Sequence, residues 1–409
     1  MISNEPIGII EFGSVKIKCI IFKINNNITE ILSTSLINSE GIHNGVVINL
    51  SKATAIVRSC ISTAEKKAEV SLKIISVVVE QPEFLSTTLS KNRKINGSKI
   101  HKDDIIFLLK EAKKQVLLND STHSIIHIFN HNYIVDGKTF AEEPIDVYAN
   151  YLSHEMTFIT MPKNNIKNIN QVFIDCDIKV DRFISSTFAL GIQLLNYNDL
   201  KFGSILIDIG FEKTSLGLFK NLSLINSMTF PIGVNHIIKD VAKVCLLTLE
   251  ESKTIIQKID FSFLDNTKIF DRNELLIDSH FKKTNFRKIS KTLLLNVIQD
   301  RQNEILETLK KQIVLSGFDP ELGNNLYITG GGSKLTNLLK YCSIFFNTDV
   351  KQVEKKNIKE FVALEDDFAG CFGALTLIKD GWETEAIPVP SKNDSDKNSF
   401  FARIFKNLT

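Results

Sequence analysis

The sequence lacks an excess of charge of either sign. Its 409 residues include 49 lysines and arginines and 47 aspartates and glutamates, well mixed, for a formal net charge of +2 at pH 7. Proteins that bind nucleic acid usually concentrate basic charge on one face or in one segment. The even balance therefore argues against a nucleic-acid binder, and any basic function must be local.

A cysteine framework is missing as well. The cysteines show no C-x-x-C pair and no matching histidine spacing, which argues against the common zinc sites and against a disulfide scaffold. Such a chain is expected in a reducing cytoplasm. The six cysteines are Cys19, Cys60, Cys176, Cys245, Cys342 and Cys371.

Long apolar runs are also absent. No stretch of the sequence approaches the roughly 18 apolar residues that a spanning helix needs. The N-terminus leads directly into strand-like sequence, without the basic and apolar regions of a secretion signal. We therefore expect any membrane contact to be peripheral.

What the sequence does contain is a repeated pattern of strands and helices, in a chain long enough for two lobes or about three to four subdomains. Residues 7–35 predict a three-stranded meander with turns at 12–14 and 25–27, then a helix capped by Ser51 and a strand over 74–79. The meander returns over 203–230, again followed by helical sequence. This repetition predicts an internally duplicated α/β fold with a cleft between the halves.

Between Pro82 and Pro162 lies a segment of different character, which we interpret as an insertion. It predicts an amphipathic helix over about 102–118 and strands over 124–129, 133–135 and 156–160. Further along, residues 241–312 are mostly helical in period, and a strand over 326–329, three glycines and a helix from about Lys334 follow.

Three glycine-containing turns carry the candidate chemistry. Two are hairpins with a carboxylate at the strand end, at residues 11–16 and 208–214, and the third is the glycine triplet of residues 328–335. A tight glycine turn directs backbone N–H groups at a phosphate, and the carboxylate can hold a magnesium ion or its waters. The candidate nucleotide-binding residues are Gly13, Ser14, Lys16, Asp208, Gly210, Thr214, Gly330, Gly331 and Gly332, and the candidate magnesium ligands are Glu11 and Asp208.

Two phosphate hairpins and a glycine-rich adenosine loop in this order resemble the pattern of the actin, Hsp70 and sugar-kinase superfamily. More local segments are similar to the FtsA family of cell division proteins over nearly the whole chain. The resemblance implies an α/β, actin-like (ribonuclease-H-like) duplicated fold, with two lobes around a nucleotide cleft and the inserted subdomain of that family. The similar segments are residues 41–50, 126–129, 133–137, 230–233 and 368–374.

The resemblance also implies the subdomain boundaries. Subdomain 1A is expected over 1–82, 162–199 and 366–382, inserted subdomain 1C over 83–161, subdomain 2A over 200–235 and 303–365, and subdomain 2B over 236–302. Residues 383–398 lose periodicity and are expected to form a flexible linker.

In function, the resemblance implies a cell-division adaptor. It would tether filaments of the tubulin-like protein FtsZ to the cytoplasmic face of the inner membrane at the septum, help assemble the divisome with other division proteins, and polymerise like actin. The C-terminal peptide of FtsZ would dock on subdomain 2B. The partner-binding residues would be Lys291, Arg301 and Glu304.

Departures from the family pattern bear on nucleotide use. Glu11 stands where the family has aspartate, Phe211 and Glu212 stand where it has glycines, and Ser186 stands where a water-orienting carboxylate is common. Lys253 and Ile256 stand at helix positions where the family usually has Glu and Lys that bind the ribose. Two interpretations stay open, retained binding of ATP with Mg and a relic that closes the cleft. In either case we expect no catalytic residue and at most a weak ATPase.

The last motif is a short amphipathic segment after Ser399, a candidate helix cap. Its apolar residues fall within an arc of roughly 140° and its two cations lie outside. This pattern suits the interface of a bilayer with anionic lipids. The alternative is a helix docked on the protein's own core. The candidate membrane-binding residues are Phe400, Phe401, Arg403, Ile404, Phe405, Lys406 and Leu408.

Two other functions compete with the FtsA-like adaptor. One is an actin-superfamily ATPase or sugar kinase, which Ser186 disfavours. The other is an adaptor resembling the pilus assembly protein PilM, which shares the fold and the insertion. The linker followed by an amphipathic segment favours the FtsA family over PilM.

Overall fold

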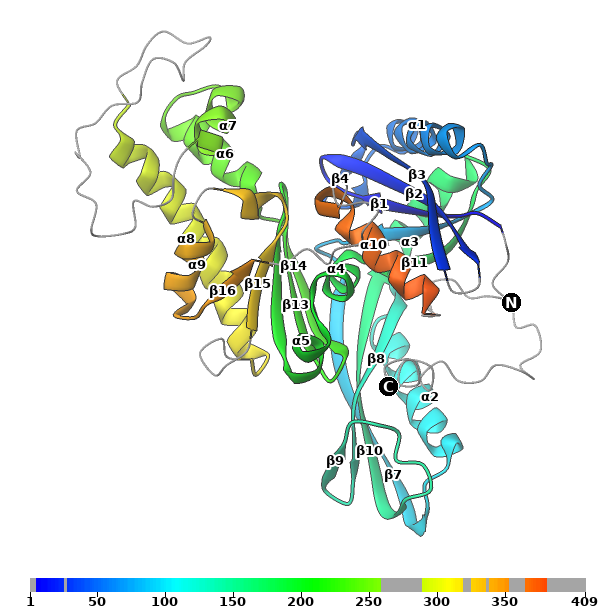
Figure 1. Ribbon diagram of the computed structural model, residues 1–409. Coiled ribbons are helices and arrows are strands. Elements are labelled where there is room, and N and C mark those ends of the chain that lie inside the picture. Colours follow the sequence, from blue (N-terminus) through cyan, green and yellow to red (C-terminus); the bar gives the residue numbers. More distant parts are fainter. Residues whose placement is uncertain are drawn as a thin grey trace. The chain divides into compact units, whose positions relative to one another are not determined.

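The computed structural model describes residues 5–25, 28–258, 289–318, 325–335, 338–352 and 365–380 (Figure 1). The predicted linker and membrane segment, residues 383–409, lie outside the described residues. The chain divides into two compact units. Among the described residues, unit 1 contains 5–202, 219–228 and 365–380, and unit 2 contains 203–218, 229–258, 289–318, 325–335 and 338–352.

Unit 1 is built on a five-stranded sheet in the order β11-β6-β1-β2-β3. Strands β1 (Ile7–Phe12), β2 (Lys16–Asn25) and β3 (Ile28–Asn38) form the predicted antiparallel meander, with Glu11 opposite Lys18. Strand β6 (Ile74–Val79) matches its predicted range and runs parallel to β1 and to β11 (Lys179–Ser185). Two short strands, β4 (Ile42–His43) and β5 (Val46–Val47), precede the first helix.

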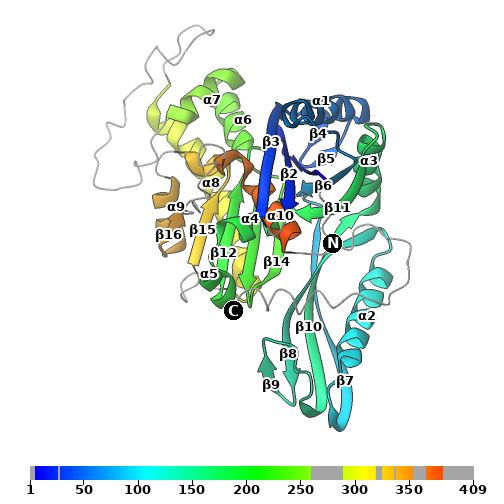
Figure 2. The same ribbon diagram turned by 45° about the vertical axis from the view of Figure 1, so that its right-hand side comes forward.

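Helices cover both faces of this sheet (Figure 2). Helices α1 (Leu50–Ala68) and α3 (Lys163–Ile174) pack together on one face, and α4 (Ser186–Leu194) and α10 (Glu365–Lys379) on the other. The predicted cap of α1 is wrong by two residues. Asn49 is the cap, because its side chain accepts a 3.0 Å hydrogen bond from the Lys52 amide, whereas Ser51 lies in the first turn and donates to Asn49 at 3.1 Å.

Helices α4 and α10 come close enough for backbone contact at one point. A Cβ atom added to Gly373 would overlap the carbonyl oxygen of Ala189. Glycine at position 373 is therefore a condition for the packing of these two helices.

The insertion forms a four-stranded antiparallel sheet in the order β7-β10-β8-β9, with one helix packed on it. The elements are β7 (Leu85–Lys99), α2 (Lys102–Asn119), β8 (His123–Val135), β9 (Lys138–Phe140) and β10 (Tyr148–Pro162). The sequence predicted α2 to within one residue but missed β7. It also split β8 in two, because the polar residues 130–132 interrupt the strand-like pattern.

The sheet of unit 2 has the order β14-β13-β12-β15-β16, although residues 219–228 of β13 and β14 cluster with unit 1. The duplicated meander is confirmed. Strand β12 pairs in parallel with β15, and β15 with β16. The strands are β12 (Ser204–Ile209), β13 (Thr214–Lys220), β14 (Ser223–Phe230), β15 (Asn325–Thr329) and β16 (Val350–Gln352).

Among the described residues of unit 2, four α-helices accompany this sheet. Helices α6 (Val234–Val244), α7 (Leu249–Lys258) and α8 (Lys291–Leu315) share a core of buried aliphatic side chains that includes Val241, Ile256 and Leu294. Helix α9 spans Leu338–Phe346. The short helix α5 (Tyr197–Phe202) precedes β12 and belongs to unit 1. Among the described helices, none is long and apolar enough to cross a membrane.

Candidate nucleotide-binding hairpins

The first hairpin joins β1 to β2 in unit 1. Gly13 is required in its turn, since a Cβ atom there would lie 2.5 Å from the Lys16 carbonyl oxygen. The Glu11 carboxylate is largely buried, with 14% of its side chain exposed, and Oε1 accepts a 3.1 Å hydrogen bond from Lys18 Nζ. The charge of the predicted magnesium ligand is therefore balanced by a lysine of the same hairpin.

Helix α10 closes the other side of Glu11. The Cys371 thiol lies 3.7 Å from Glu11 Oε2 and donates to it. Burial, and then the Glu11 charge, raise the pKa of this thiol well above its ordinary value, so it stays protonated. A Cβ atom on Gly370 would lie 3.0 Å from Glu11 Oε2. The Glu11 carboxylate is thus enclosed by residues of β2 and α10.

Lys16, the predicted phosphate-binding cation, begins β2 and has an ionic partner on helix α10. Its Nζ lies 3.5 Å from Asp367 Oδ2, and the two side chains are 40% and 53% exposed. An ion pair this exposed is weak and rearranges easily. Lys16 can therefore leave Asp367 for a phosphate, whereas Lys18 is held at Glu11.

The second hairpin joins β12 to β13 in unit 2. The Gly210 amide donates to the Lys213 carbonyl at 2.9 Å and closes the turn. The carbonyls of Gly210 and Phe211 accept from the amides of Val234 (3.1 Å) and Asn235 (2.8 Å) at the start of α6. These bonds fix the turn to the N-terminus of α6. They also occupy the amides of Val234 and Asn235, so the helix dipole rather than these amides would favour an anion there.

The glycine triplet lies against the same hairpin. Gly330 has φ +88°, and a Cβ atom there would overlap Asp208 Oδ1 and lie 2.5 Å from the Ile209 carbonyl oxygen. A Cβ atom on Gly332 would lie 2.5 Å from Ile209 Cγ2, whereas Gly331 has nothing within 4 Å. The structure therefore brings Asp208 and the predicted glycines of unit 2 together and leaves open space at Gly331.

Other parts of the unit 2 prediction need correction. The helix expected from Lys334 is a 3₁₀ turn over Gly331–Lys334, and α9 begins at Leu338. Thr214 is fully buried, and its hydroxyl donates to the Ile232 carbonyl at 2.7 Å. The Thr214 hydroxyl thus already has a structural partner on its own unit.

The two residues that replace the family's glycines in the second hairpin, Phe211 and Glu212, are both engaged by the helices of unit 2. Phe211 packs against the apolar core of α6, α7 and α8. Glu212 Oε1 accepts a 2.8 Å hydrogen bond from Asn235 Nδ2. The ring and the carboxylate therefore contribute to the attachment of the hairpin to α6, a role that sequence reasoning missed.

Sequence reasoning also missed a buried carboxylate in unit 1. Glu80, 2% exposed, accepts hydrogen bonds at Oε2 from the Ser185 hydroxyl (2.7 Å) and the Thr187 amide (2.9 Å). Ser186 is the first residue of α4, so Glu80 lies at the helix start where the missing catalytic carboxylate was sought. The available signal was an acidic residue directly after the buried strand β6.

The predicted partner-binding residues lie on α8. Arg301 Nε donates to Asp240 Oδ2 of α6 and Nη1 donates to Glu304 Oε2, each at 2.6 Å. The hydrogen bond to Asp240 is the main cause that raises the pKa of Arg301. Lys291, the first residue of α8, lies ten residues away, or about 15 Å along the helix. The structure thus joins Arg301 and Glu304 but not Lys291.

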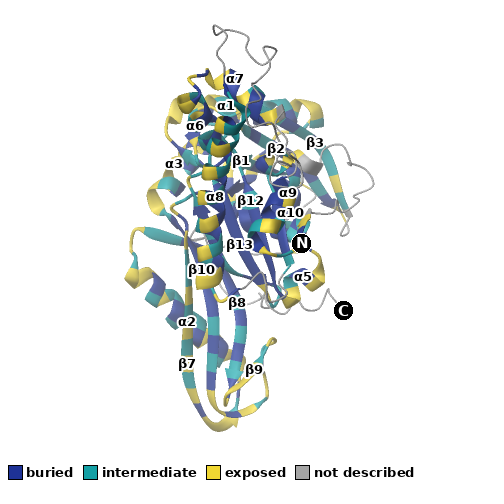
Figure 3. Cartoon of the chain, turned by 90° about the vertical axis from the view of Figure 1, so that its left-hand side faces the viewer, coloured by how far each residue is buried: buried dark blue, intermediate teal, exposed yellow. Residues whose placement is uncertain are grey.

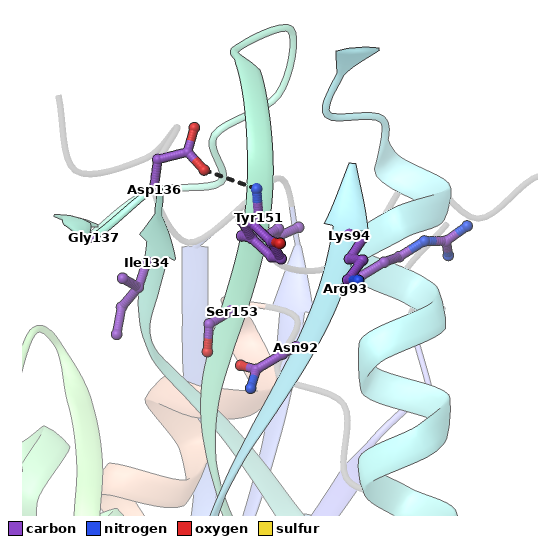
Figure 4. Close-up of a pocket in the computed structure, with 9 residues that line it drawn as sticks. Asn92, Arg93, Lys94, Ile134, Asp136, Gly137, Tyr151 and Ser153 are labelled. Atoms are coloured by element: carbon purple, nitrogen blue, oxygen red, sulfur yellow. Dashed lines mark hydrogen bonds between the residues drawn. The ribbon is translucent and has the colours of Figure 1, made fainter. Parts of the chain in front are cut away.

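A pocket of about 460 Å³ opens on the sheet of the insertion (Figure 4). Asp136 accepts hydrogen bonds at one end of it from the backbone amides of Asn150 (3.0 Å) and Tyr151 (2.8 Å). The Asp136 carboxylate thus holds the first residues of β10, at the register shift between Ala149 and Tyr151. The lining residues are Asn92, Arg93, Lys94, Ile134, Asp136, Gly137, Tyr151, Leu152 and Ser153. None of the predicted hairpin residues lines this pocket.

Comparison with solved structures defines the class of protein. The fold is similar to that of the PilM–PilN type IV pilus biogenesis complex (TM-score 0.64, 12% identity, 93% of this chain and 99% of that chain). It is also similar to MreB5 of Spiroplasma citri bound to ADP (TM-score 0.54, 12% identity, 92% and 98%). Together with the duplicated sheets and hairpins, these similarities confirm an actin-like α/β fold.

Sequence comparison identifies the family. The model of the "SHS2 domain inserted in FTSA" matches residues 84–160, and that of the "Cell division protein FtsA" matches residues 205–368. The chain belongs to the FtsA family of cell division proteins. Relatives named Cell division protein FtsA include those of Agrobacterium fabrum (22% identity, 82% of this chain, 78% of the relative) and Buchnera aphidicola subsp. Acyrthosiphon pisum (23%, 98% and 95%).

Proposed function

We propose that this protein is an adaptor that tethers FtsZ filaments to the cytoplasmic face of the inner membrane at the division septum. It polymerises like actin and helps to assemble the other division proteins. The observation that carries the proposal is the engagement of the first hairpin's Glu11 by Lys18 and Cys371, in a chain of the FtsA family. A carboxylate held in this way serves structure rather than turnover.

ATP with Mg fits the residues of unit 2 better than those of unit 1. Asp208, Gly210 and the triplet 330–332 would hold the nucleotide, because the backbone there is bare and Gly331 faces open space. On the first hairpin, the exposed Lys16 is a separate candidate for a phosphate contact. Bound nucleotide would supply a ligand that stabilises the assembled form, with no catalytic carboxylate at Ser186 to activate water.

The measurement of ATP turnover tests the adaptor against the ATPase and sugar-kinase alternatives. The purified protein, alone and with a sugar panel, should hydrolyse or transfer at well below one turnover per second, the low end of the common enzyme range of about 1–10³ s⁻¹. Faster turnover would contradict the adaptor proposal. Binding is measured separately by titration with a non-hydrolysable ATP analogue.

For the FtsZ peptide, Arg301 is the proposed anchor on α8. Because Asp240 and Glu304 already hold it, an incoming carboxylate has to share the guanidinium, and a bidentate fork allows such sharing. Arg301→Gln should weaken peptide binding about tenfold or more, within the roughly 1.5–3 kcal/mol of a charge-assisted hydrogen bond. Lys311→Gln, which removes an exposed cation from the same helix, is the matched control.

The same titration also separates the FtsA-like adaptor from the PilM-like one. An FtsZ C-terminal peptide that binds to neither the wild type nor Lys311→Gln would remove FtsZ as the partner. Equal affinity of Arg301→Gln and wild type would remove Arg301 from the site but leave the adaptor in place.

Membrane attachment is assigned to residues 399–409 from their sequence pattern. Phe401→Glu or Phe405→Glu should abolish co-sedimentation with anionic liposomes, whereas Ala402→Glu adds the same charge outside the apolar arc and should have little effect. Five apolar side chains hold one tail only weakly, so polymerisation must join many tails on one surface. Binding should therefore rise steeply with protein concentration. Retention of full binding by a chain ending at Asn398 would contradict the assignment.

A further inference from the structure

Helix α2 of the insertion has an unusual outer face. Its buried residues, among them Ile105, Leu108 and Ala112, pack toward β7 and β10. The remaining circumference exposes four large apolar side chains, two near each end of the helix. They are Ile106 (37% exposed), Phe107 (46%), Leu117 (45%) and Leu118 (74%).

Lysines occupy the middle of the same face. Lys110 and Lys114 are exposed and Lys113 is partly exposed. Positions four and seven residues apart share one side of a helix. One side of α2 therefore carries Ile106, Lys110, Lys113 and Leu117. The adjoining side carries Phe107, Lys110, Lys114 and Leu118. We call these seven residues, Ile106, Phe107, Lys110, Lys113, Lys114, Leu117 and Leu118, the α2 face.

The charge of the α2 face is positive. Arg93 of β7 adds a cation beside it, because its guanidinium carbon lies 4.4 Å from the centre of the Phe107 ring. Of the nearby acids, Asp104 pairs with Arg93 at 3.0 Å and accepts from the His101 amide, Glu111 is partly buried, and Asp103 lies at the N-terminal end. Three lysines therefore lie among the four apolar side chains, whereas the charge of Arg93 is balanced by Asp104.

We propose that the α2 face binds an anionic lipid surface. Apolar side chains among lysines are the composition of helices that lie in the headgroup region, where the apolar groups enter the lipid and the cations meet phosphate. Figures 1 and 2 show α2 along the outside of the insertion, and Figure 3 shows exposed residues along the helix. A lone convex helix offers a flat bilayer the whole face, whereas an amphipathic peptide helix is bound in a hydrophobic groove.

The inference extends the proposed function and does not depend on the tail. In the proposed function, residues 399–409 form the membrane contact. The α2 face would be a second contact, on the folded body. Two weak contacts on one chain bind a surface cooperatively when both reach it. The second contact would also hold the insertion at the bilayer.

The experiment compares four full-length proteins: wild type, Lys110→Gln/Lys114→Gln, Phe401→Glu/Phe405→Glu, and the combination of all four substitutions. A lysine near an anionic surface contributes about 1 kcal/mol, which corresponds to about fivefold in affinity. The α2 double variant should therefore bind vesicles of phosphatidylglycerol and phosphatidylcholine about 20- to 30-fold more weakly than wild type. In Phe401→Glu/Phe405→Glu the α2 face should leave only a residual affinity, too weak for co-sedimentation but measurable by titration with excess vesicles, and the combined variant should lose it. High salt should remove the difference.

A matched control has the same charge change elsewhere on unit 1. Lys66 of α1 and Lys167 of α3 are exposed helix lysines with no exposed large apolar side chain within one turn along their own helices. Lys66→Gln/Lys167→Gln should leave vesicle binding within about twofold of wild type, because a distributed charge effect is screened over a Debye length of about 10 Å. If this control weakens binding as much as the α2 variant, general electrostatics explain the result and the proposal fails.

A second measurement reports contact directly. An environment-sensitive dye attached to Cys at position 118, in Leu118→Cys, should shift to the blue with anionic vesicles and stay unchanged with pure phosphatidylcholine. An unshifted dye, or α2 variants that bind like their parents, would overturn the lipid assignment and indicate an acidic protein surface instead. A failure of the tail proposal looks different, since Phe401→Glu/Phe405→Glu would then bind normally while the α2 variant still loses affinity.

Discussion

The two hairpins share one sequence pattern but differ in the residues that contact their carboxylates. In unit 1, Glu11 is enclosed by Lys18 and by Cys371 of α10. In unit 2, Asp208 lies against the bare Cα of Gly330, and the hairpin is fixed to α6 through backbone hydrogen bonds. The first hairpin has become part of the core by ion pairing. The second keeps close contacts between its carboxylate and the glycine triplet.

The same comparison can be made between the whole units. The largest effect is expected at acid pH, which should lower the folding stability of unit 1. Burial lowers the pKa of His127 to about 3, of His131 to about 4 and of His154 to about 3, all in the insertion of unit 1. Each histidine binds its proton at about pH 6.5 when unfolded. Stability is therefore complete above pH 6.5 and is lost as the pH falls below it, by about 1.4 kcal/mol per pH unit and histidine.

At pH 5 each buried histidine should cost about 2 kcal/mol. His154→Leu should lessen this loss, because the His154 ring is buried against Tyr133 and no hydrogen-bond partner of its nitrogens is found among the described residues. Denaturant unfolding at pH 7.5 and pH 5 measures the effect, with circular dichroism as the probe. A wild type equally stable at both values would show that the histidines do not control unit 1.

Alanine at the two glycines that face the carboxylates should distinguish the hairpins next. Gly330→Ala combines a positive φ with overlap on Asp208 and Ile209, and we expect a loss of about 3 kcal/mol or more. Gly370→Ala meets the Glu11 carboxylate at 3.0 Å, and a shift of a few tenths of an ångström relieves it, so about 1 kcal/mol is expected. Equal thermal denaturation midpoints for Gly330→Ala and Gly370→Ala would contradict the expected difference between the two hairpins.

Removal of Lys18 tests whether ion pairing holds the first hairpin. Lys18→Met leaves Glu11 largely buried and without its main cation, which should cost about 2–3 kcal/mol. The further change Glu11→Gln in the same chain should recover most of this loss, because no buried charge is then uncompensated. A double-mutant cycle in urea gives the coupling, and the prediction is wrong if the double variant is less stable than Lys18→Met.

The smallest effect is expected for the exposed ion pair between Lys16 of the same hairpin and Asp367 of α10. Lys16→Met or Asp367→Asn should change the free energy of unfolding by about 0.5 kcal/mol or less, because solvent screens both side chains. Lys16→Met should nevertheless weaken the binding of an ATP analogue. If stability falls as much as it does for Lys18→Met, Lys16 is a structural residue and the contrast within unit 1 disappears.

Much of the fold was predictable, because alternating and helical apolar patterns are local properties of the sequence. Strand β6 and both meanders follow from them, and so does α2. Strand β7 was missed because its many polar and charged residues face solvent, with an exposed or partly exposed side chain at nearly every position. An edge strand of this kind is stabilised by pairing with β10, which sequence periodicity does not report.

The candidate site was predictable in position but not in partners. The turn glycines and Asp208 lie together as the motifs indicated. Lys18, Cys371 and Asn235 escaped notice because they reach the hairpins from a neighbouring strand or from helices elsewhere in the chain. Opposite charges and hydrogen-bond partners across a fold depend on tertiary packing, and a single sequence contains no direct record of it.

The contact of α4 with α10 at Gly373 has a consequence for the evolution of this protein. Every single-base change of a glycine codon that alters the residue introduces a Cβ atom, or ends the chain. At Gly373 each of these changes would force the Ala189 carbonyl and the two helices apart. Drift at this codon is therefore confined to synonymous changes unless the backbone of α4 has already shifted, because the overlap is with main-chain atoms that every residue at position 189 carries.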